Sequence, residues 1–236
     1  YYDPLTHLPN RRLLMDRLGQ ALASSTRSGC HGAIIFLDLD NFKTLNDTRG
    51  HAVGDLLLAE VAQRLHCGVR EGDTISRLGD TISRLGGDEF VVVLEDLSTE
   101  AVEAAAQARL VGEKVREALA RPYDLDGREF HCTASVGVTL LHNHDEPVES
   151  LLKQADLALY QAKGAGRNCL RFFDPAMQSA IDEYSALEAD LRQAVQRGQL
   201  QLYYQPQLDS KRQVIGAEAL LRWRHPQRGL VAPDSF

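Results

Sequence analysis

Apolar positions recur along the chain with two different periods, and each period predicts one kind of element. Between residues 8 and 25, Leu14, Leu18, Ala21 and Leu22 follow the i, i+4, i+7, i+8 spacing of an amphipathic helix. Continuous apolar runs at 33–37 and 90–94 instead predict buried strands, the first of which turns acidic at its end. The N-terminal part therefore reads as a helix followed by strands.

The same alternation continues through the next hundred residues. Helices are expected at 51–65, 99–119 and 147–166, and strands at 130–141 and 168–173. Pro147 suits the start of the last helix and the glycines at 164 and 166 suit its end. Strands alternating with helices in this order predict an α/β (α+β) sandwich in which helices cover one sheet.

A domain boundary is expected near Asp174 and Pro175. Beyond it, the pattern predicts a helix at 185–199 and strands at 200–209 and 214–223. We therefore expect one domain at 1–174, and a linker helix with the beginning of a second domain at 175–236. The chain starts without Met and ends in mid-pattern, as a piece of a longer protein would.

Composition narrows the classes of protein that this chain can belong to. Its net charge of -7 argues against a nucleic-acid surface, where clustered Lys and Arg are expected. The run at 33–37 is too short to cross a bilayer, and no signal-peptide pattern opens the chain, so we expect a cytoplasmic protein without a membrane segment. The four cysteines form no CxxC pair, which favours reduced thiols over disulfides or a zinc site.

The first candidate site is the acidic end of the strand at 33–40. Asp38 and Asp40 alternate along this strand, so both project to one face near its C-terminal end. Clustered carboxylates are costly unless a cation neutralises them, and their oxygens suit Mg²⁺. A solvated strand-to-helix turn with acidic caps would give the same pattern, and DLD alone favours that explanation.

The second candidate site is the run GGDEF at 86–90. Two glycines permit a tight turn with positive φ, which presents Asp88 and Glu89 beside the apolar strand at 90–94. An ordinary polar hairpin explains this run equally well when it is taken alone. If the two acidic strand ends lie on adjacent strands, however, they form a metal pocket.

The third candidate site is the run KGAGRN at 163–168. Lys163 and Arg167 lie four residues apart at a helix end, so they can point in the same direction. Cations there commonly complement the helix dipole. Opposite a metal–carboxylate site, they would also suit the phosphates of a nucleotide.

Taken with DPLTHLPNRR at 3–12, these motifs closely resemble GGDEF-domain diguanylate cyclases, from residue 3 through KGAGRN. One departure is His7, where the family usually carries Gly. The tail, with YYQPQLD at 203–209 and EALLRWRHP at 218–226, resembles the opening of an EAL domain, the cyclic di-GMP phosphodiesterase module with a TIM-like barrel.

The resemblance implies a fold and a reaction. The fold is a central sheet wrapped by helices, related to the palm of nucleotide cyclases. The reaction joins two GTP molecules into cyclic di-GMP and releases two pyrophosphates, with two Mg²⁺ (or Mn²⁺) ions per GTP half-site. Each protomer supplies one half-site, so catalysis requires a homodimer, an arrangement suited to twofold symmetry.

The resemblance also assigns roles to single residues. Asp38, the Leu39 carbonyl and Asp88 would bind the metals, while Glu89 in the same turn would assist there. Asn46 and Asp55 correspond to the pair that reads guanine. By the same resemblance, Lys43, Lys163 and Arg167 would bind the phosphates. The catalytic residues would be Asp88, Glu89 and Lys163.

The heptapeptide DTISRLG occurs twice in tandem, at 73–79 and 80–86. Cyclases of this family often carry an inhibitory RxxD site for the product at a fixed distance before GGDEF, and Arg77 with Asp80 has that spacing. Arg70 with Asp73 is the alternative, because it would take this spacing if one copy were deleted. Seven residues inserted into a strand would turn its faces over, so we expect the extra copy to lie outside the paired strand.

Three functions remain open at this stage: an active cyclase, a catalytically silent regulatory module that binds GTP or cyclic di-GMP, and a dimerising scaffold. The complete set of family residues favours catalysis. Glu218 matches the metal-binding glutamate of EAL phosphodiesterases. The other ligands of that chemistry come from later barrel strands, so we expect no phosphodiesterase activity from this chain.

Overall fold

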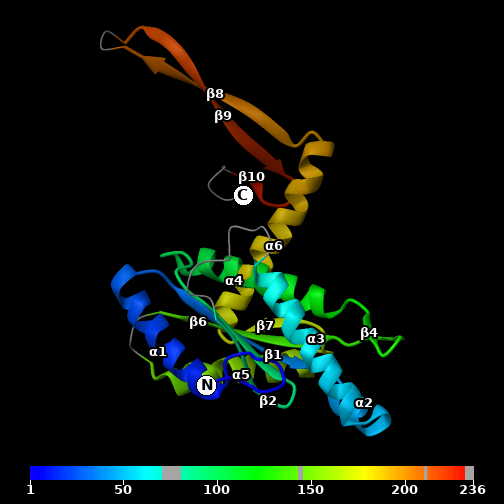
Figure 1. Cartoon of the computed structure of the whole chain (residues 1–236). Coiled ribbons are helices and arrows are strands. Elements are labelled where there is room, and N and C mark those ends of the chain that lie inside the picture. Colours follow the sequence, from blue (N-terminus) through cyan, green and yellow to red (C-terminus); the bar gives the residue numbers. More distant parts are fainter. Residues whose placement is uncertain (71–80, 143–145, 210–211, 232–236) are drawn as a thin grey trace. The chain divides into compact units, whose positions relative to one another are not determined.

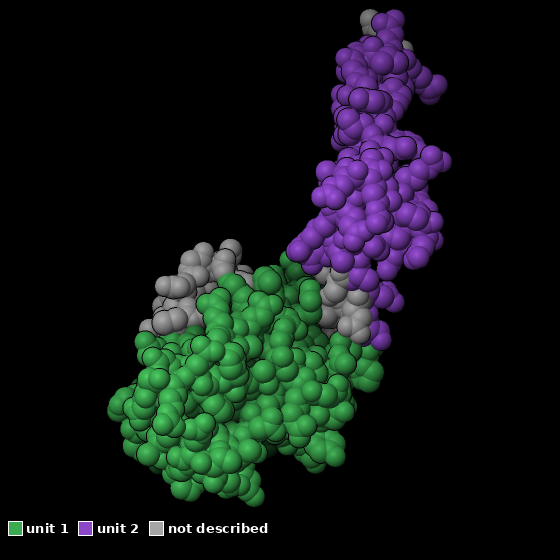
Figure 2. Space-filling view, turned by 90° about the vertical axis from the view of Figure 1, so that its right-hand side faces the viewer, with its two compact units in different colours: residues 1–178 green, residues 179–236 purple. Residues whose placement is uncertain are grey.

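The computed structural model describes residues 1–70, 81–142, 146–209 and 212–231. The chain forms two compact units, Tyr1–Gln178 and Ser179–Phe236 (Figure 2). The elements of the first unit are α1 (Arg11–Ser28), β1 (Gly32–Leu39), α2 (Phe42–Arg49), α3 (His51–Arg70), β2 (Thr81–Gly86), β3 (Glu89–Leu94), α4 (Ala101–Leu119), β4 (Tyr123–Leu125), β5 (Arg128–Phe130), β6 (Ala134–Leu141), α5 (Val148–Gly164) and β7 (Leu170–Phe172).

A five-stranded sheet in the order β2-β3-β1-β6-β7 forms the centre of the first unit. Its pairs are antiparallel except β6 with β7, which run parallel. All eight residues of β1 are buried, as expected for a central strand covered on both faces. The register sets Asp38 opposite Glu89 on β3 and opposite Ser135 on β6. The two acidic strand ends therefore lie on adjacent strands.

Helices cover both faces of this sheet (Figure 1). On one face, α1 and α5 contribute leucines and alanines to a core that also contains Ile34 and Phe36 of β1. On the other face, α4 packs against β1, β6 and β7, and α3 packs against α4. Gly137 lets α5 approach β6 closely, because a Cβ there would lie 2.2 Å from the Ala155 carbonyl oxygen. This close packing fixes the distance between α5 and the sheet. The candidate phosphate-binding residues lie at and just after the end of this helix.

The second unit is small and is built around one sheet. The helix α6 (Pro175–Gln196) begins in the first unit, and the strands are β8 (Leu200–Leu208), β9 (Val214–His225) and β10 (Gly229–Val231). Leu187, Ala194 and Trp223 form its core. The strands form an open antiparallel sheet in the order β10-β9-β8, and no closed barrel occurs among the described residues.

Most elements match the sequence predictions, and the α/β fold class is confirmed. The predicted strand at 130–141 was wrong in extent: β5 ends at Phe130, and β6 begins only at Ala134. The helix α2, the strand β2 and the short β4–β5 hairpin were not predicted. The domain boundary after residue 174 stays a prediction. None of the described helices is long and apolar enough to span a membrane.

Candidate active site

The candidate active site is an acidic cluster at the end of β1, which consists of Asp38, Asp88 and Glu89. Asp38 is 9% exposed, and its Oδ1 lies 2.7 Å from Nζ of Lys163 at the end of α5. Glu89 is directly across the antiparallel pair, so both side chains project to the same face of the sheet. Like charges in directly opposite positions are destabilising. A fold that retains this pair sacrifices stability at this place.

The turn between β2 and β3 presents Asp88 beside this pair. Gly86 and Gly87 have φ values of 150° and 55°, which are accessible mainly to glycine, as the sequence predicted. The Leu39 N–H donates to the Asp88 carbonyl oxygen at 3.4 Å, so the turn adjoins the end of β1. The structure thus brings Asp38, Leu39 and Asp88 into one place, next to Glu89.

Arg84, a residue that the sequence analysis did not select, holds this turn. Its Nε and Nη2 donate to the Gly87 carbonyl oxygen at 3.1 and 2.7 Å, and its Nη1 pairs with Oδ1 of Asp3 at 2.9 Å. Burial alone would raise the pKa of Asp3, but hydrogen bonds from Thr6 and the ion pair with Arg84 outweigh burial and lower it. The Arg84 guanidinium therefore joins the N-terminal loop to the turn between β2 and β3.

His7 lies in that same N-terminal loop. Its φ of 57° is left-handed, a conformation that glycine adopts without strain and that histidine adopts at some cost. This backbone conformation suits the glycine that the related cyclases usually carry here, and we expect the effect of His7 to be local.

The negative charge of the acidic cluster exceeds the positive charge that Lys163 supplies. Burial raises the pKa of Asp38, and Asp88 and Asp40 add to this effect, although the hydrogen bond from Lys163 opposes it. Burial also raises the pKa of Glu89, and the charges of Asp38, Asp156 and Asp88 raise it further. A cation that binds here would relieve this repulsion.

Asp156 is a further acidic residue near the cluster that the sequence analysis missed. It lies on α5 seven residues before Lys163, a spacing of about two helical turns that places both on one helix face. This periodicity was readable in the sequence. Only the packing of α5 over β1 and β6 shows that this face meets the acidic strand end.

The donor set at the end of β1 fits a divalent metal that the substrate helps to bind. Among the described residues, no group of three or more His, Cys, Asp or Glu side chains is arranged to hold a metal by itself. Mg²⁺ is commonly held by one or two carboxylates together with substrate phosphates. Asp38, Asp88 and the Leu39 carbonyl oxygen match that requirement in number and in chemistry.

Asp40, the second aspartate of the first candidate site, is held by groups of the protein. It is 6% exposed, and both of its oxygens accept short hydrogen bonds, from Ser135 Oγ at 2.7 Å and from Thr133 Oγ1 at 2.7 Å. The Asn168 N–H also donates to it, at 3.1 Å. The strand was predicted to include Asp40, but β1 ends at Leu39, and the Asp40 carboxylate is already satisfied by the protein.

The residues expected to read guanine lie on α2 and α3. The Oδ1 atom of Asn46 is buried and has no hydrogen-bond partner within the described part of the chain. It lies against Gly54, where a Cβ would come within 2.0 Å of it. Asp55 follows Gly54 and is exposed, as is Lys43 on α2. An unsatisfied buried polar atom requires an explanation, and a ligand that donates a hydrogen bond supplies one.

The phosphate-binding candidates lie around the end of α5. Lys163 is 35% exposed while it pairs with Asp38, and Arg167 is exposed. Arg167 and Asn168 both have positive φ, at 65° and 44°, so the chain turns sharply after the helix.

The duplicated heptapeptide is only partly described. The second copy forms β2, which pairs with β3 through Gly86. Arg77, Asp80 and Asp73 lie outside the described residues, and of Arg70 only the backbone, at the end of α3, is described. Neither proposed product site is therefore tested by the structure.

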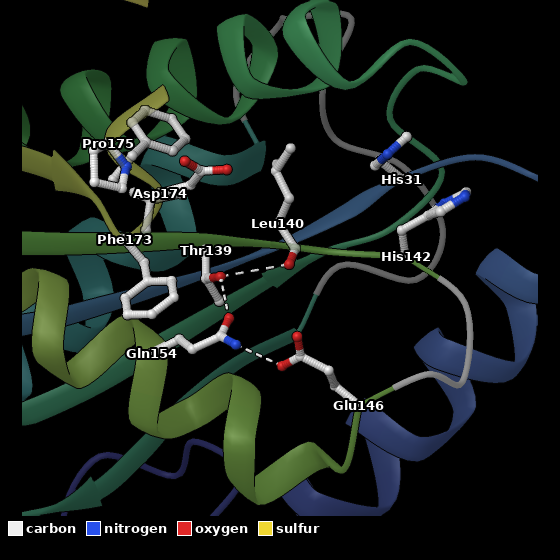
Figure 3. Close-up of a pocket in the computed structure, with 11 residues that line it drawn as sticks. His31, Thr139, Leu140, His142, Glu146, Gln154, Phe173, Asp174 and Pro175 are labelled. Carbon is white, nitrogen blue, oxygen red and sulfur yellow. Dashed lines mark hydrogen bonds between the residues drawn. The ribbon is translucent and has the colours of Figure 1, made fainter. Parts of the chain in front are cut away.

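A separate cavity of about 390 Å³ lies at the other end of the sheet (Figure 3). Its lining includes Thr139, Gln154 and Asp174, and the stacked rings of His31 and His142, whose centroids are 4.0 Å apart. Because β6 runs antiparallel to β1, Leu140 and His142 lie near the beginning of β1, away from Asp38. The cavity contains none of the expected site residues.

Two family models match the chain. Residues 1–169 match the family model described as "Diguanylate cyclase, GGDEF domain", and residues 188–236 match the EAL domain. The chain belongs to the GGDEF diguanylate cyclase family and continues into the start of an EAL domain.

Two relatives from Pseudomonas aeruginosa align over the whole chain. MucR, named a bifunctional diguanylate cyclase/cyclic di-GMP phosphodiesterase, is 44% identical over 236 residues, and NbdA, named a cyclic di-GMP phosphodiesterase, is 40% identical. The chain covers 33% of MucR and 28% of NbdA, so it spans about a third of the length of these relatives.

Solved structures show the same fold. The isolated GGDEF domain of YfiN (TpbB) from Pseudomonas aeruginosa is 32% identical with a TM-score of 0.65, over 80% of this chain and 99% of that one. The GGDEF domain of DgcB from Caulobacter crescentus, solved in complex with c-di-GMP, is 28% identical with a TM-score of 0.61, over 73% of this chain and 93% of that one.

Proposed function

We propose that the chain is an active diguanylate cyclase, which condenses two GTP molecules into cyclic di-GMP and two pyrophosphates at a metal-dependent site shared by two protomers. The observation that carries this proposal is the under-neutralised carboxylate pair Asp38 and Glu89, set across adjacent strands beside Asp88 and supplied with one ammonium group. Family membership and the c-di-GMP complex of the related DgcB domain support it.

Asp38, Asp88 and the Leu39 carbonyl would hold Mg²⁺ or Mn²⁺, which when bound stabilises charge on the α-phosphate and the leaving pyrophosphate. Glu89 lies beside these ligands and assists in holding the positive charge. Lys163 neutralises Asp38 in the absence of nucleotide. It lies close enough to exchange this carboxylate for a phosphate oxygen once other cations neutralise Asp38.

Arg167 and Lys43 supply the remaining positive charge for the triphosphate. Both are exposed, so their ammonium and guanidinium groups can reach a ligand without a change in the core. Positioning of the phosphates and electrostatic stabilisation account for most of the catalysis in phosphoryl transfer, and fixed cations provide both.

Asn46 and Asp55 select guanine over adenine. The Asp55 carboxylate accepts from the N1–H and 2-amino donors of guanine, and the buried amide of Asn46 completes the recognition. Adenine lacks these donors and would leave the site's polar groups unpaired, at a cost of about 1–3 kcal/mol.

Each chain offers one GTP half-site, so the reaction requires two chains facing each other. A site of this kind is completed by the second copy and is suited to twofold symmetry. Product inhibition through Arg77 and Asp80, or through Arg70 and Asp73, is part of the same proposal.

Incubation of the purified chain with GTP and Mg²⁺, followed by chromatographic separation of the nucleotides, tests the proposal. We expect cyclic di-GMP and pyrophosphate in a one-to-two ratio, at a rate that rises with the square of protein concentration while the chain is mostly monomeric. A fusion to a dimeric coiled coil is the control that separates inactivity from a lack of dimers.

A second function is favoured by the similarity to NbdA, which is named for phosphodiesterase activity alone. In that case the GGDEF domain is a catalytically silent regulatory module that binds GTP or cyclic di-GMP. Absence of product from the forced dimer, with GTP binding retained in calorimetry, would establish this alternative and overturn the first.

A further inference from the structure

We propose that Asp40 is a positioning residue that fixes the phosphate-binding turn after α5, and that it is not a metal ligand. This inference rests on the proposed function, because the turn carries Arg167 and follows Lys163. It adds a role for a side chain that neither the motif comparison nor the cluster of metal-binding candidates includes.

Three hydrogen bonds from two other segments converge on the Asp40 carboxylate. Ser135 Oγ donates to Oδ1 at 2.7 Å, while Thr133 Oγ1 and the Asn168 N–H donate to Oδ2 at 2.7 and 3.1 Å. Ser135 is fully buried, and Asp40 is 6% exposed. The Asp40 N–H also donates to the Thr133 carbonyl oxygen at 2.8 Å. This carboxylate thus joins the ends of β1 and β6 to the turn after α5.

The turn requires such an anchor because its backbone is not relaxed. Gly166, Arg167 and Asn168 have φ values of 112°, 65° and 44°, three successive positive values of which two belong to non-glycine residues. Left-handed conformations of such residues persist when surrounding contacts hold them. Within the turn itself, the Arg167 N–H donates to the Ala162 carbonyl oxygen at 3.2 Å.

A second anchor comes from the other face of the sheet. Nη1 of Arg116 on α4 donates to Oδ1 of Asn168 at 2.8 Å and to its carbonyl oxygen at 3.4 Å. The backbone N–H of Asn168 is therefore held by Asp40, and its carbonyl and side chain are held by Arg116. Arg167, the preceding residue, is left with little freedom in its backbone.

Asp38 on β1 and Asp40, directly after β1, thus hold one segment at two points. Asp38 holds the side chain of Lys163 by charge, and Asp40 holds the backbone of Asn168 by a hydrogen bond. The first contact can be exchanged when nucleotide and metal arrive, whereas the second is partly buried and is made to a main-chain group. Arg167 lies between these points, so its position relative to the carboxylates is set by β1.

The chemistry of the Asp40 contacts provides a decisive substitution. In Asp40→Asn, the amide oxygen can accept from both Thr133 and Asn168, and the amide nitrogen can donate to the Ser135 hydroxyl, which both donates and accepts. A positioning role therefore survives this change. A metal ligand or a required negative charge does not, and Asp40→Ala removes all three contacts.

The test compares Asp40→Asn and Asp40→Ala with the unchanged chain and with Asp124→Ala, which removes an exposed carboxylate on β4. We measure calorimetric affinity for a GTP analogue with a methylene bridge between the α- and β-phosphates, in Mg²⁺. We expect Asp40→Asn to bind within about threefold of the unchanged chain, and Asp40→Ala to bind about tenfold more weakly. Arg116→Gln, which removes only the second anchor of Asn168, should weaken binding about threefold. If Asp40→Ala does not fold, Asp40→Asn decides, because clearly weaker binding by that variant would overturn the positioning role.

Amide hydrogen exchange at Asn168, followed by NMR, reads the contact without any nucleotide. Exchange at this amide should accelerate about tenfold or more in Asp40→Ala and remain near its original rate in Asp40→Asn. Equal loss of affinity in Asp40→Asn and Asp40→Ala would overturn the positioning role, as would unchanged exchange at Asn168 in Asp40→Ala. If the unchanged chain binds no GTP analogue, the proposed function fails, and exchange at Asn168 alone decides whether Asp40 holds the turn.

Discussion

Two carboxylate environments lie side by side at the end of β1. Asp38 faces Glu89 across the strand pair, and one ammonium group opposes the charge of the cluster. Two residues further on, Asp40 receives three hydrogen bonds from groups of the protein. Two aspartates that are two residues apart, one on β1 and one directly after it, thus differ: Asp38 has a single ammonium partner beside other carboxylates, whereas Asp40 has three hydrogen-bond donors.

The difference between these carboxylates distinguishes one that holds neighbouring segments together from one that is available to a ligand. A buried carboxylate that the protein satisfies completely has little capacity left for a ligand, whereas one that it leaves short of positive charge can gain from a cation. Such unsatisfied groups reduce the stability of the fold and are retained where activity requires them. We therefore propose a supporting role for Asp40 and a role in the reaction for Asp38.

The strongest way to break this comparison is Asp38→Asn. This change removes the charge that we propose binds the metal, while it keeps the shape of the side chain. We expect cyclic di-GMP production to fall about 10³-fold, because electrostatic groups at reacting phosphates have effects of this size. The melting temperature should stay the same or rise, since the repulsion with Glu89 disappears. Asp124→Asn, at an exposed position on β4, is the control, and an equal loss of activity there would contradict the role assigned to Asp38.

Arg84→Ala should have the next largest effect, on stability. It removes two hydrogen bonds to Gly87 and the ion pair with Asp3, and we expect the free energy of unfolding to fall by about 2–3 kcal/mol at pH 7. The Asp3 contribution is present above the ordinary Asp pKa of 3.8 and is lost as pH falls through the lowered pKa of the folded state.

Urea unfolding of Arg84→Ala at pH 7 and at low pH measures this effect, with Arg84→Lys as a partial replacement that keeps the charge. A deficit of equal size at both pH values would show that the Asp3 ion pair contributes nothing.

Gly54→Ala tests the guanine-reading side of the site. A methyl group there would collide with Oδ1 of Asn46, so the amide must move. We expect affinity for GTP to fall about tenfold, the equivalent of about 1.4 kcal/mol, with a smaller change for ATP. Gly19→Ala, on α1 where nothing lies within 4 Å of the added Cβ, is the matched control. Equal weakening of GTP and ATP would show that Asn46 does not read the base.

Glu89→Gln should have the smallest effect, on stability. Because the folded-state pKa of Glu89 is raised, its ionised form costs the fold free energy above that pKa and costs nothing below the ordinary value of 4.5. We expect a gain of about 0.5–1 kcal/mol at pH 7 without divalent metal, which disappears as pH falls toward about 4. Thermal unfolding at several pH values measures it, and a gain that grows on acidification would contradict the sign of this shift.

Much of the fold was predictable from apolar periodicity. The long helices and the buried strands β1 and β3 stand out because their patterns run over many residues. The helix α2 was missed because it is short and joined to α3 through Gly50 alone. The strand β2 was missed because its sequence, TISRLG, alternates weakly and repeats a segment that precedes it.

The candidate site was predictable in composition but not in detail. The motifs indicated Asp38, Asp88 and Lys163, and the ion pair between Asp38 and Lys163 agrees with them. The different environments of Asp38 and Asp40 could not be predicted from the sequence. They depend on Thr133, Ser135 and Asn168, which come from segments far along the chain. Arg84 was missed for the same reason: its partner Asp3 lies 81 residues earlier in the chain.

Binding of Mn²⁺ in the presence of the methylene-bridged GTP analogue, followed by water-proton relaxation, tests the central claim most directly. The claim predicts that the unchanged chain binds Mn²⁺ together with the analogue, that Asp38→Asn loses this binding, and that Asp40→Asn retains it. Retention of full Mn²⁺ binding by Asp38→Asn, or its loss in Asp40→Asn alone, would contradict the assignment of these two carboxylates.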